Sequence, residues 1–135
     1  MINEPVGDRK ILVIESIEDD TALRHAIRDR FTREGFKVIE AADGEDGLAK
    51  ALSERPDLIL LDLILPKIDG ITVMKKLRHA DEWGKKVPII LLTNVPIDDN
   101  KIIQAVVENN PTYYLIKSDW KMSDLVEKIR EKLAR

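Results

Sequence analysis

Four apolar runs of this 135-residue sequence end in polar side chains that could do chemistry together. They supply carboxylates, hydroxyls and one ammonium group. Two carboxylates crowded together repel each other unless a cation lies between them. Mg²⁺ does this with oxygen ligands, and a lysine does it without a metal. The residues at the four ends are Glu15-Ser16, Asp62, Thr93-Asn94 and Lys117-Ser118.

Each of these residues also has an ordinary explanation when it is taken alone. An acid or a lysine at a strand end is usually solvated, and a threonine there usually completes a turn. The run LILLD, which ends at Asp62, would then only bring the chain back to the surface. The functional interpretation therefore depends on whether the fold brings the four ends together.

The elements that would position these residues alternate between strand and helix. Runs of β-branched and apolar residues predict strands buried on both faces, and apolar residues at helical spacing predict amphipathic helices between them. Residues 82–86 are expected to form a loop, and Asp19 or Asp20 is expected to cap the first helix. The predicted strands are 10–15, 36–41, 57–62, 87–93 and 113–117, and the predicted helices are 21–34, 43–55, 69–80, 100–108 and the segment from 122.

Five strand–helix pairs with short connections predict the α/β class, with a doubly wound, five-stranded parallel sheet and helices on both faces. In such sheets, sites lie at the carboxyl ends of the strands. Glu15, Asp62, Thr93 and Lys117 are therefore expected to meet at one edge of the sheet. One domain is expected over 10–135, preceded by an N-terminal tail, 1–9.

Composition limits the classes of protein to which the chain can belong. The formal net charge is −3, with 44% hydrophobic and 35% charged residues, so we expect a folded domain without direct nucleic-acid contacts. The sequence contains no cysteine, which excludes disulfides and thiolate sites. No apolar run reaches the roughly 20 residues that a membrane helix needs, and no signal peptide is recognisable. We expect a cytoplasmic protein without membrane association.

Four motifs in a fixed order make the chain similar to the receiver domain of two-component response regulators. The resemblance runs from about residue 10 to residue 133 and rests on ILVIE, DLILLDLILPKIDG, VPIILLT and YYLIKS. It implies a (βα)5 flavodoxin-like fold. It also implies a histidine kinase or a phosphotransfer protein as a partner. Such a domain is not a conventional enzyme, although it promotes its own phosphorylation and the hydrolysis of its aspartyl phosphate.

The resemblance gives a role to the residues at the strand ends. Asp62 is the implied phosphoacceptor, while Lys117 and Thr93 would contact phosphoryl oxygens. The implied cofactor is Mg²⁺. Its ligands would be Glu15, Asp62, the backbone carbonyl of Ile64 and, by position, Ser16.

A conformational switch is also implied. Thr93 would move towards the phosphoryl group, and Tyr114, three residues before Lys117, would move with it. The affected face consists of the fourth helix, the fifth strand and the fifth helix. The chain is accordingly expected to be a stand-alone receiver that acts through a downstream protein bound at this face, with a homodimer left open.

Three positions depart from the family pattern. Ser16 stands where a second metal-binding acid is usual, and a neutral hydroxyl is a weaker Mg²⁺ ligand than a carboxylate. Glu18 and Asp19 are the candidates to compensate, although acids in the first turn of a helix are favourable for the helix dipole in any case. Asn94 replaces a small residue, and Ser118 replaces a proline that often follows a cis bond, so both the dephosphorylation rate and the geometry of this bond are left open.

Two alternative functions remain. A pseudo-receiver would bind partners without phosphorylation, because Ser16 weakens the metal site. A flavin-binding electron-transfer protein of similar topology would need a loop rich in Ser, Thr or Gly after the first strand to hold a phosphate. The segment ESIEDD at that place is acidic and disfavours a bound phosphate.

Overall fold

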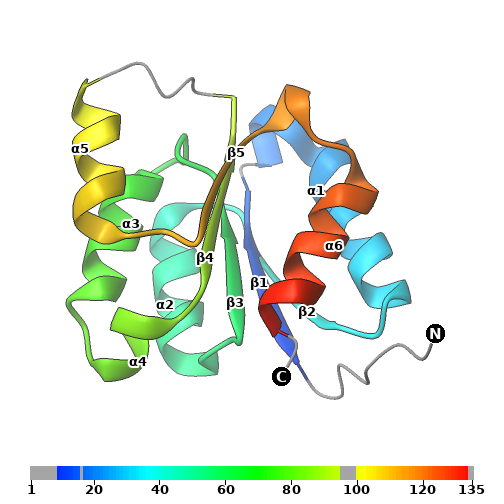
Figure 1. Ribbon diagram of the computed structural model, residues 1–135, viewed down its shortest axis with the longest axis horizontal. Coiled ribbons are helices and arrows are strands. Elements are labelled where there is room, and N and C mark those ends of the chain that lie inside the picture. The colour runs from blue at the N-terminus through cyan, green and yellow to red at the C-terminus, as the bar shows by residue number, and fades with distance from the viewer. Residues whose placement is uncertain (1–8, 16, 95–99, 134–135) are drawn as a thin grey trace.

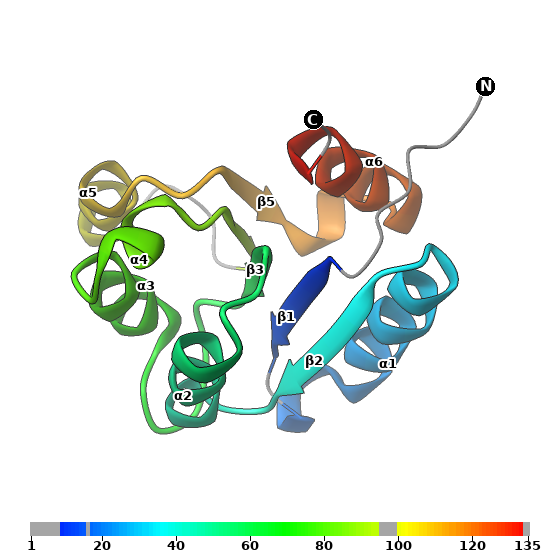
Figure 2. The same ribbon diagram turned by 90° about the horizontal axis from the view of Figure 1, so that it is seen from below.

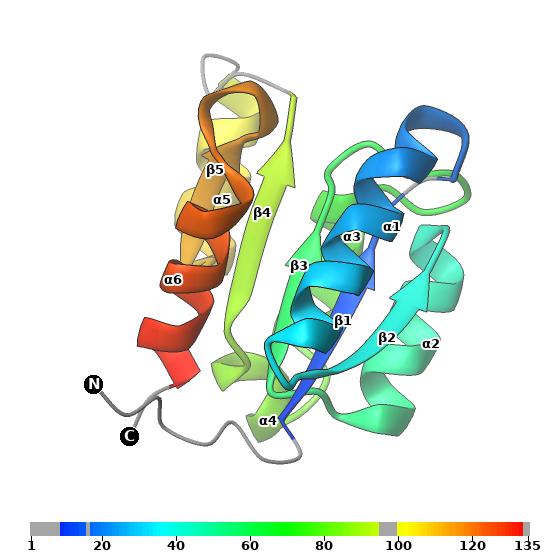
Figure 3. The same ribbon diagram turned by 90° about the vertical axis from the view of Figure 1, so that its right-hand side faces the viewer.

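The apolar runs form one parallel sheet in the computed structural model of the chain, which describes residues 9–15, 17–94 and 100–133. The order of the strands is β2-β1-β3-β4-β5, and all pair in parallel. Their carboxyl ends therefore lie at one edge, at the top of Figure 3. The strands are β1 (Lys10–Ile14), β2 (Lys37–Ala41), β3 (Leu58–Leu61), β4 (Ile89–Thr93) and β5 (Tyr113–Ile116).

Helices cover both faces of the sheet, as Figures 1 and 2 show. α1 and α6 lie on one face, while α2, α3 and α5 lie on the other with the short α4 beside α3. The predicted doubly wound α/β sandwich is thus confirmed. The helices are α1 (Ile17–Arg33), α2 (Gly44–Glu54), α3 (Gly70–Arg78), α4 (Glu82–Lys86), α5 (Asn100–Asn109), the 3-10 turn η1 (Lys117–Asp119) and α6 (Met122–Leu133).

Successive side chains of the central strands point to opposite faces of the sheet, which produces two cores, one on each face. In β1, Ile11 and Val13 belong to the core beneath α1 and α6, whereas Leu12 and Ile14 belong to the core beneath α2 and α3. All four side chains are fully buried. Burial on both faces explains why the central strands are apolar without interruption.

Two local predictions were wrong. Residues 82–86 form α4 instead of a loop; the Asp81 side chain accepts a 2.7 Å hydrogen bond from the backbone N–H of Gly84 and caps this single turn. α1 begins at Ile17, so Asp19 and Asp20 lie in its first turn and neither is the N-cap. Acidic residues there are favourable because they lie near the positive end of the helix dipole.

Arg78, at the end of α3, joins two other helices, α4 and α5, through its guanidinium group. Its Nε donates to the backbone oxygen of Asn109 at 2.8 Å, and its Nη2 donates to that of Asn110 at 3.2 Å, so it holds the C-terminal end of α5. Nη1 donates to the carbonyls of Gly84 at 2.8 Å and Val87 at 2.7 Å. Burial lowers the pKa of Arg78.

The expected tail, 1–9, lies outside the described residues except for residue 9. Within the described residues, no helix has the length and apolar character that crossing a membrane requires.

Candidate functional site

Glu15 and Asp62 lie side by side at the carboxyl edge of the sheet, because β1 and β3 are neighbours with Ile14 opposite Leu61. Each residue extends its strand by one backbone hydrogen bond. The N–H of Asp62 donates to the carbonyl of Ile14, and that of Glu15 donates to the carbonyl of Ala41, both at 3.1 Å. Glu15 is 1% exposed and Asp62 is 4% exposed. The two carboxylates are thus held in place and largely removed from water.

Lys117, the first residue after β5, supplies a cation between these carboxylates. Its Nζ lies 2.8 Å from Oε1 of Glu15 and 3.0 Å from Oδ2 of Asp62. Burial alone would lower the pKa of Lys117, but the hydrogen bonds and charges of Glu15 and Asp62 outweigh burial and raise that pKa. The lysine therefore stays charged, and the three groups form a buried, charge-coupled cluster.

The burial of the Glu15 carboxylate is only partly offset by its contact with Lys117. Burial, and to a smaller extent the charge of Asp62, raise the pKa of Glu15 to about 8, although Lys117 acts in the opposite direction. Its Oε2 is buried and has no hydrogen-bond partner among the described residues. A buried oxygen without a partner is unfavourable, and a bound cation would satisfy it.

The residues at this edge fit Mg²⁺ as a bound ion. Mg²⁺ commonly uses one or two carboxylates and keeps several water ligands; Glu15 and Asp62 are such a pair. The described residues contain no group of three or more His, Cys, Asp or Glu residues that could hold a metal. Ser16 lies outside the described residues, as do the side chains of Glu18 and Asp19, so their expected contributions remain predictions.

The loop after Asp62 folds back onto that residue. The N–H of Ile64 donates to Oδ1 of Asp62 at 3.2 Å, so both carboxylate oxygens have a donor, the second being Lys117. Gly70 closes the loop through a 2.8 Å hydrogen bond from its N–H to the carbonyl of Leu63. A Cβ on Gly70 would lie 2.1 Å from the backbone oxygen of Asp62, so only glycine fits there.

Thr93 and Tyr114, the residues expected to act in a switch, lie on neighbouring strands. Thr93 is fully buried at the carboxyl end of β4 and is opposite Ile116 in the strand register. Tyr114, like Ile102 and Val106 of α5, packs against the core beneath α2 and α3, whereas Tyr113 packs against the other core. The two tyrosines therefore lie on opposite faces of the sheet.

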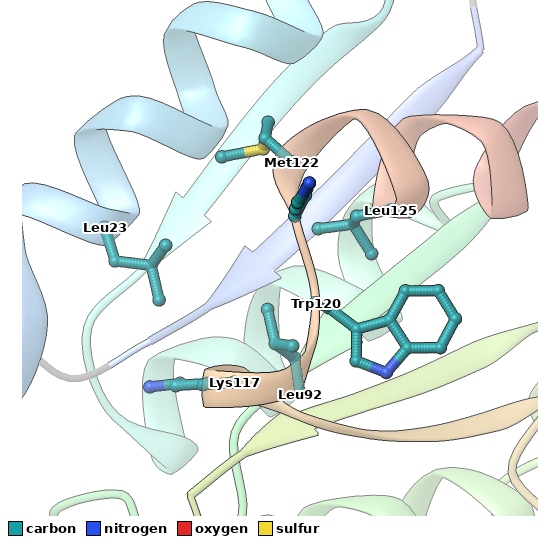
Figure 4. Close-up of a pocket in the computed structure, with 7 residues that line it drawn as sticks. Leu23, Leu92, Lys117, Trp120, Met122 and Leu125 are labelled. Carbon is teal, nitrogen blue, oxygen red and sulfur yellow. The ribbon is translucent and has the colours of Figure 1, made fainter.

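A small apolar pocket, which the sequence did not predict, borders Lys117 on the side of α1 and α6. Figure 4 shows Leu23 of α1 across from Trp120 and Leu125, with the lysine at the edge. Trp120 also packs against the core beneath α1 and α6, and Trp83 packs against the opposite core.

The remaining departures from the expected pattern lie around these strand ends. Asn94 is exposed directly after β4. The peptide bond between Lys117 and Ser118 is trans, as are the other peptide bonds of the described residues. The sequence did not predict that Gly44 contacts the loop after Asp62; the only signal there is the dipeptide Asp-Gly at the start of the predicted helix 43–55.

Known proteins are similar to this chain over most of its length. The family described as response regulator receiver domain matches residues 13–130. The transcriptional regulatory protein AfsQ1 of Streptomyces coelicolor is 44% identical over 101 residues, which cover 75% of this chain and 42% of that protein. The chain spans about two fifths of the length of such curated relatives.

The solved structures that are similar to this chain include receiver domains as well. A response regulator receiver domain protein (CheY-like) from Methanospirillum hungatei has a TM-score of 0.81 and 28% identity, with 94% of each chain covered. The receiver domain of the sensor histidine kinase PA1611 from Pseudomonas aeruginosa, solved with a magnesium ion coordinated in the active-site cleft, has a TM-score of 0.77 and 27% identity. That match covers 96% of this chain and 100% of the other.

Proposed function

Because this chain belongs to the response regulator receiver domain family, we propose that it accepts a phosphoryl group on Asp62 from a histidine kinase or a phosphotransfer protein. The observation that carries the proposal is the setting of Asp62. Its carboxylate is 4% exposed, lies at the carboxyl edge of the sheet and has the Lys117 ammonium 3.0 Å away.

The contacts of Asp62 suit a nucleophile in phosphoryl transfer, which depends mainly on positioning and on neutralising oxygen charge. In the proposed step, a carboxylate oxygen of Asp62 forms a bond to phosphorus while the bond from phosphorus to the donor nitrogen or oxygen breaks. Lys117 stabilises the charge on the phosphoryl oxygens, and the Thr93 hydroxyl would donate to one of them. The N–H of Ile64 helps to orient the acceptor.

The proposed cofactor is Mg²⁺. Glu15, Asp62 and the backbone carbonyl of Ile64 would hold the ion, with Ser16 as a further ligand by position. When bound, it would neutralise negative charge on the carboxylates and the phosphoryl oxygens. The partnerless Oε2 of Glu15 supports this assignment.

We propose that phosphorylation is read out at the face formed by α5, β5 and α6. These are the fourth helix, fifth strand and fifth helix of the expected pattern, because α4 is additional. Thr93 and Tyr114 would connect the site to this face. Two large apolar side chains of α5 are exposed on it, Ile103 at 40% and Val107 at 75%, which suits a downstream protein or a second copy of the chain. The negative net charge supports a protein partner over nucleic acid, and a kinase-coupled domain of this kind would act in the cytoplasm.

A pseudo-receiver is the second candidate function, and one observation favours it. Lys117 already lies between Glu15 and Asp62, so these carboxylates are partly neutralised without a metal. With Ser16 in place of an acid, the chain would then bind its partner without being phosphorylated.

Intact mass spectrometry after incubation with acetyl phosphate tests the proposal, with and without Mg²⁺. We expect one added phosphoryl group on the wild-type protein with Mg²⁺, and none on Asp62→Asn. Asp29→Asn is the matched control, because Asp29 is an exposed acid of α1 with a side chain that is 63% exposed. Equal labelling of Asp62→Asn and the wild type would refute the assignment. No labelling of the wild type, either by acetyl phosphate or by a phosphorylated kinase, would favour the pseudo-receiver.

A further inference from the structure

The loop that follows Asp62, residues 63–69, packs against the N-terminal turn of α2. The N–H of Gly44 donates to the carbonyl of Pro66 at 3.1 Å. Lys67 Nζ lies 3.6 Å from Oδ2 of Asp43, the residue whose side chain caps α2. The first residues of α2 thus contact the middle of the loop, although the two segments lie far apart in the chain.

Gly44 is required at this contact by the closeness of the loop backbone. A Cβ on Gly44 would lie 1.8 Å from the carbonyl oxygen of Ile68 and 2.7 Å from its carbonyl carbon. Gly44 is not among the residues with a positive φ, so its value lies in letting the two backbones approach.

The loop is held at its other end as well. Gly70 lies against the backbone of Asp62 and Leu63, and its N–H closes the loop onto the carbonyl of Leu63. Between the two glycines, Lys67 has a φ of 69°. This left-handed conformation is unfavourable for a residue with a side chain and persists where surrounding contacts impose it.

We propose that the N-terminal turn of α2 positions the phosphoacceptor loop, with Gly44 as the positioning residue. Gly44 contacts Pro66 and Ile68, and the same loop contains Ile64, whose N–H binds Oδ1 of Asp62. Displacing the loop at Ile68 would therefore move the backbone of Ile64 away from the acceptor. The consequence for Mg²⁺ and phosphorylation rests on the proposed function.

The substitution Gly44→Ala tests this coupling, and Gly84→Ala is its matched control. A Cβ on Gly84 would lie 1.9 Å from the carbonyl oxygen of Leu77, a clash of the same kind at the far end of α3. Both variants should lose stability. Only Gly44→Ala should change the amide NMR shifts of residues 63–69 in the metal-free protein, weaken Mg²⁺ binding about tenfold or more, and slow phosphorylation by acetyl phosphate in proportion.

A second variant keeps the test decisive if Gly44→Ala does not fold. Lys67→Ala removes the ion pair with Asp43 and keeps the unfavourable φ at this position, so the loop loses a contact that holds it and gains no clash. We expect faster amide hydrogen exchange confined to residues 63–69, together with weaker Mg²⁺ binding.

The two proposals fail in different ways. If Gly44→Ala and Gly84→Ala leave the shifts of 63–69 and the Kd for Mg²⁺ equally unaffected, or if hydrogen exchange in Lys67→Ala is unchanged, the positioning role is refuted. If the wild-type protein binds no Mg²⁺ and accepts no phosphoryl group, the proposed function fails, while the loop shifts still decide whether α2 positions the loop.

Discussion

Replacing Arg78 with alanine should be among the most destabilising changes at the surface of this domain. The guanidinium group donates four hydrogen bonds to backbone carbonyls of α4, its following residue Val87 and the end of α5. Alanine would leave all four carbonyls without this donor. It would also remove a positive charge from the C-terminal end of α5, where the helix dipole favours one.

The size of the effect follows from these contacts. A hydrogen bond to a charged group contributes about 1.5–3 kcal/mol, so four of them set an upper limit of about 12 kcal/mol. Part of this would be recovered, because Arg78 is only partly buried and Asn110 is exposed, so water can reach the carbonyl of Asn110 and the opening that the side chain leaves. We therefore expect a loss of about 2–4 kcal/mol in the free energy of unfolding.

Urea unfolding monitored by tryptophan fluorescence measures this loss. With an m-value of about 1–3 kcal/mol/M, the midpoint should fall by roughly 1–2 M while the m-value stays the same. Arg78→Lys should recover little, because an ammonium cannot form the fork that reaches four carbonyls.

Arg55→Ala is the control, because it removes an arginine that makes only exposed contacts. Arg55 is exposed, forms a 2.7 Å ion pair with Asp81 and lies 5.2 Å from the ring of Trp83. Exposed contacts of this type contribute up to about 1 kcal/mol. If the Arg78 and Arg55 variants lose the same small free energy, the assignment of Arg78 as a major tertiary contact is wrong.

Two further predictions concern the end of α1. The hydrogen bond with Arg130, followed in size by the one with Arg30, lowers the pKa of Glu34. Ionised Glu34 therefore stabilises the fold at pH values above its unfolded pKa of 4.5. This contribution is lost as the pH falls through the lower pKa of the folded state. Glu34→Gln should be less stable than the wild type by about 1 kcal/mol at neutral pH. In urea titrations at acid pH this difference in stability should vanish. A difference that grows in acid would show that the pKa of Glu34 is not lowered by folding. Gly35 has a φ of 97°, so Gly35→Ala should lower the free energy of unfolding by roughly 1 kcal/mol or more in the same assay, and an unchanged or raised stability would show that the backbone there adapts without strain.

The meeting of Glu15, Asp62 and Lys117 was predictable from the sequence for a simple geometric reason. Each residue ends an apolar run, and the carboxyl ends of parallel strands share an edge. The pattern of the runs also predicted the two-sided burial of the sheet. Neither inference required knowledge of any loop.

The contacts that the sequence did not reveal depend on where separate elements pack. Arg78 ends an ordinary amphipathic helix, and only the tertiary placement of α4 and α5 brings carbonyls within its reach. Gly44 likewise acquires its role from the approach of a distant loop. α4 was missed because a single turn is too short to show helical periodicity, and its stability comes from the Asp81 cap.

The order of the strands has a consequence for how the domain forms during synthesis. With β1 between β2 and β3, the strands can join the growing sheet almost in the order in which the ribosome releases them. Glu15 and Asp62 would be brought together when β3 pairs with β1, but Lys117 lies 55 residues beyond Asp62 and arrives only with β5. Two carboxylates without a cation are costly to bury. A nascent chain should therefore keep this edge hydrated until its last strand is in place, and the burial of the acidic pair would mark the completion of folding.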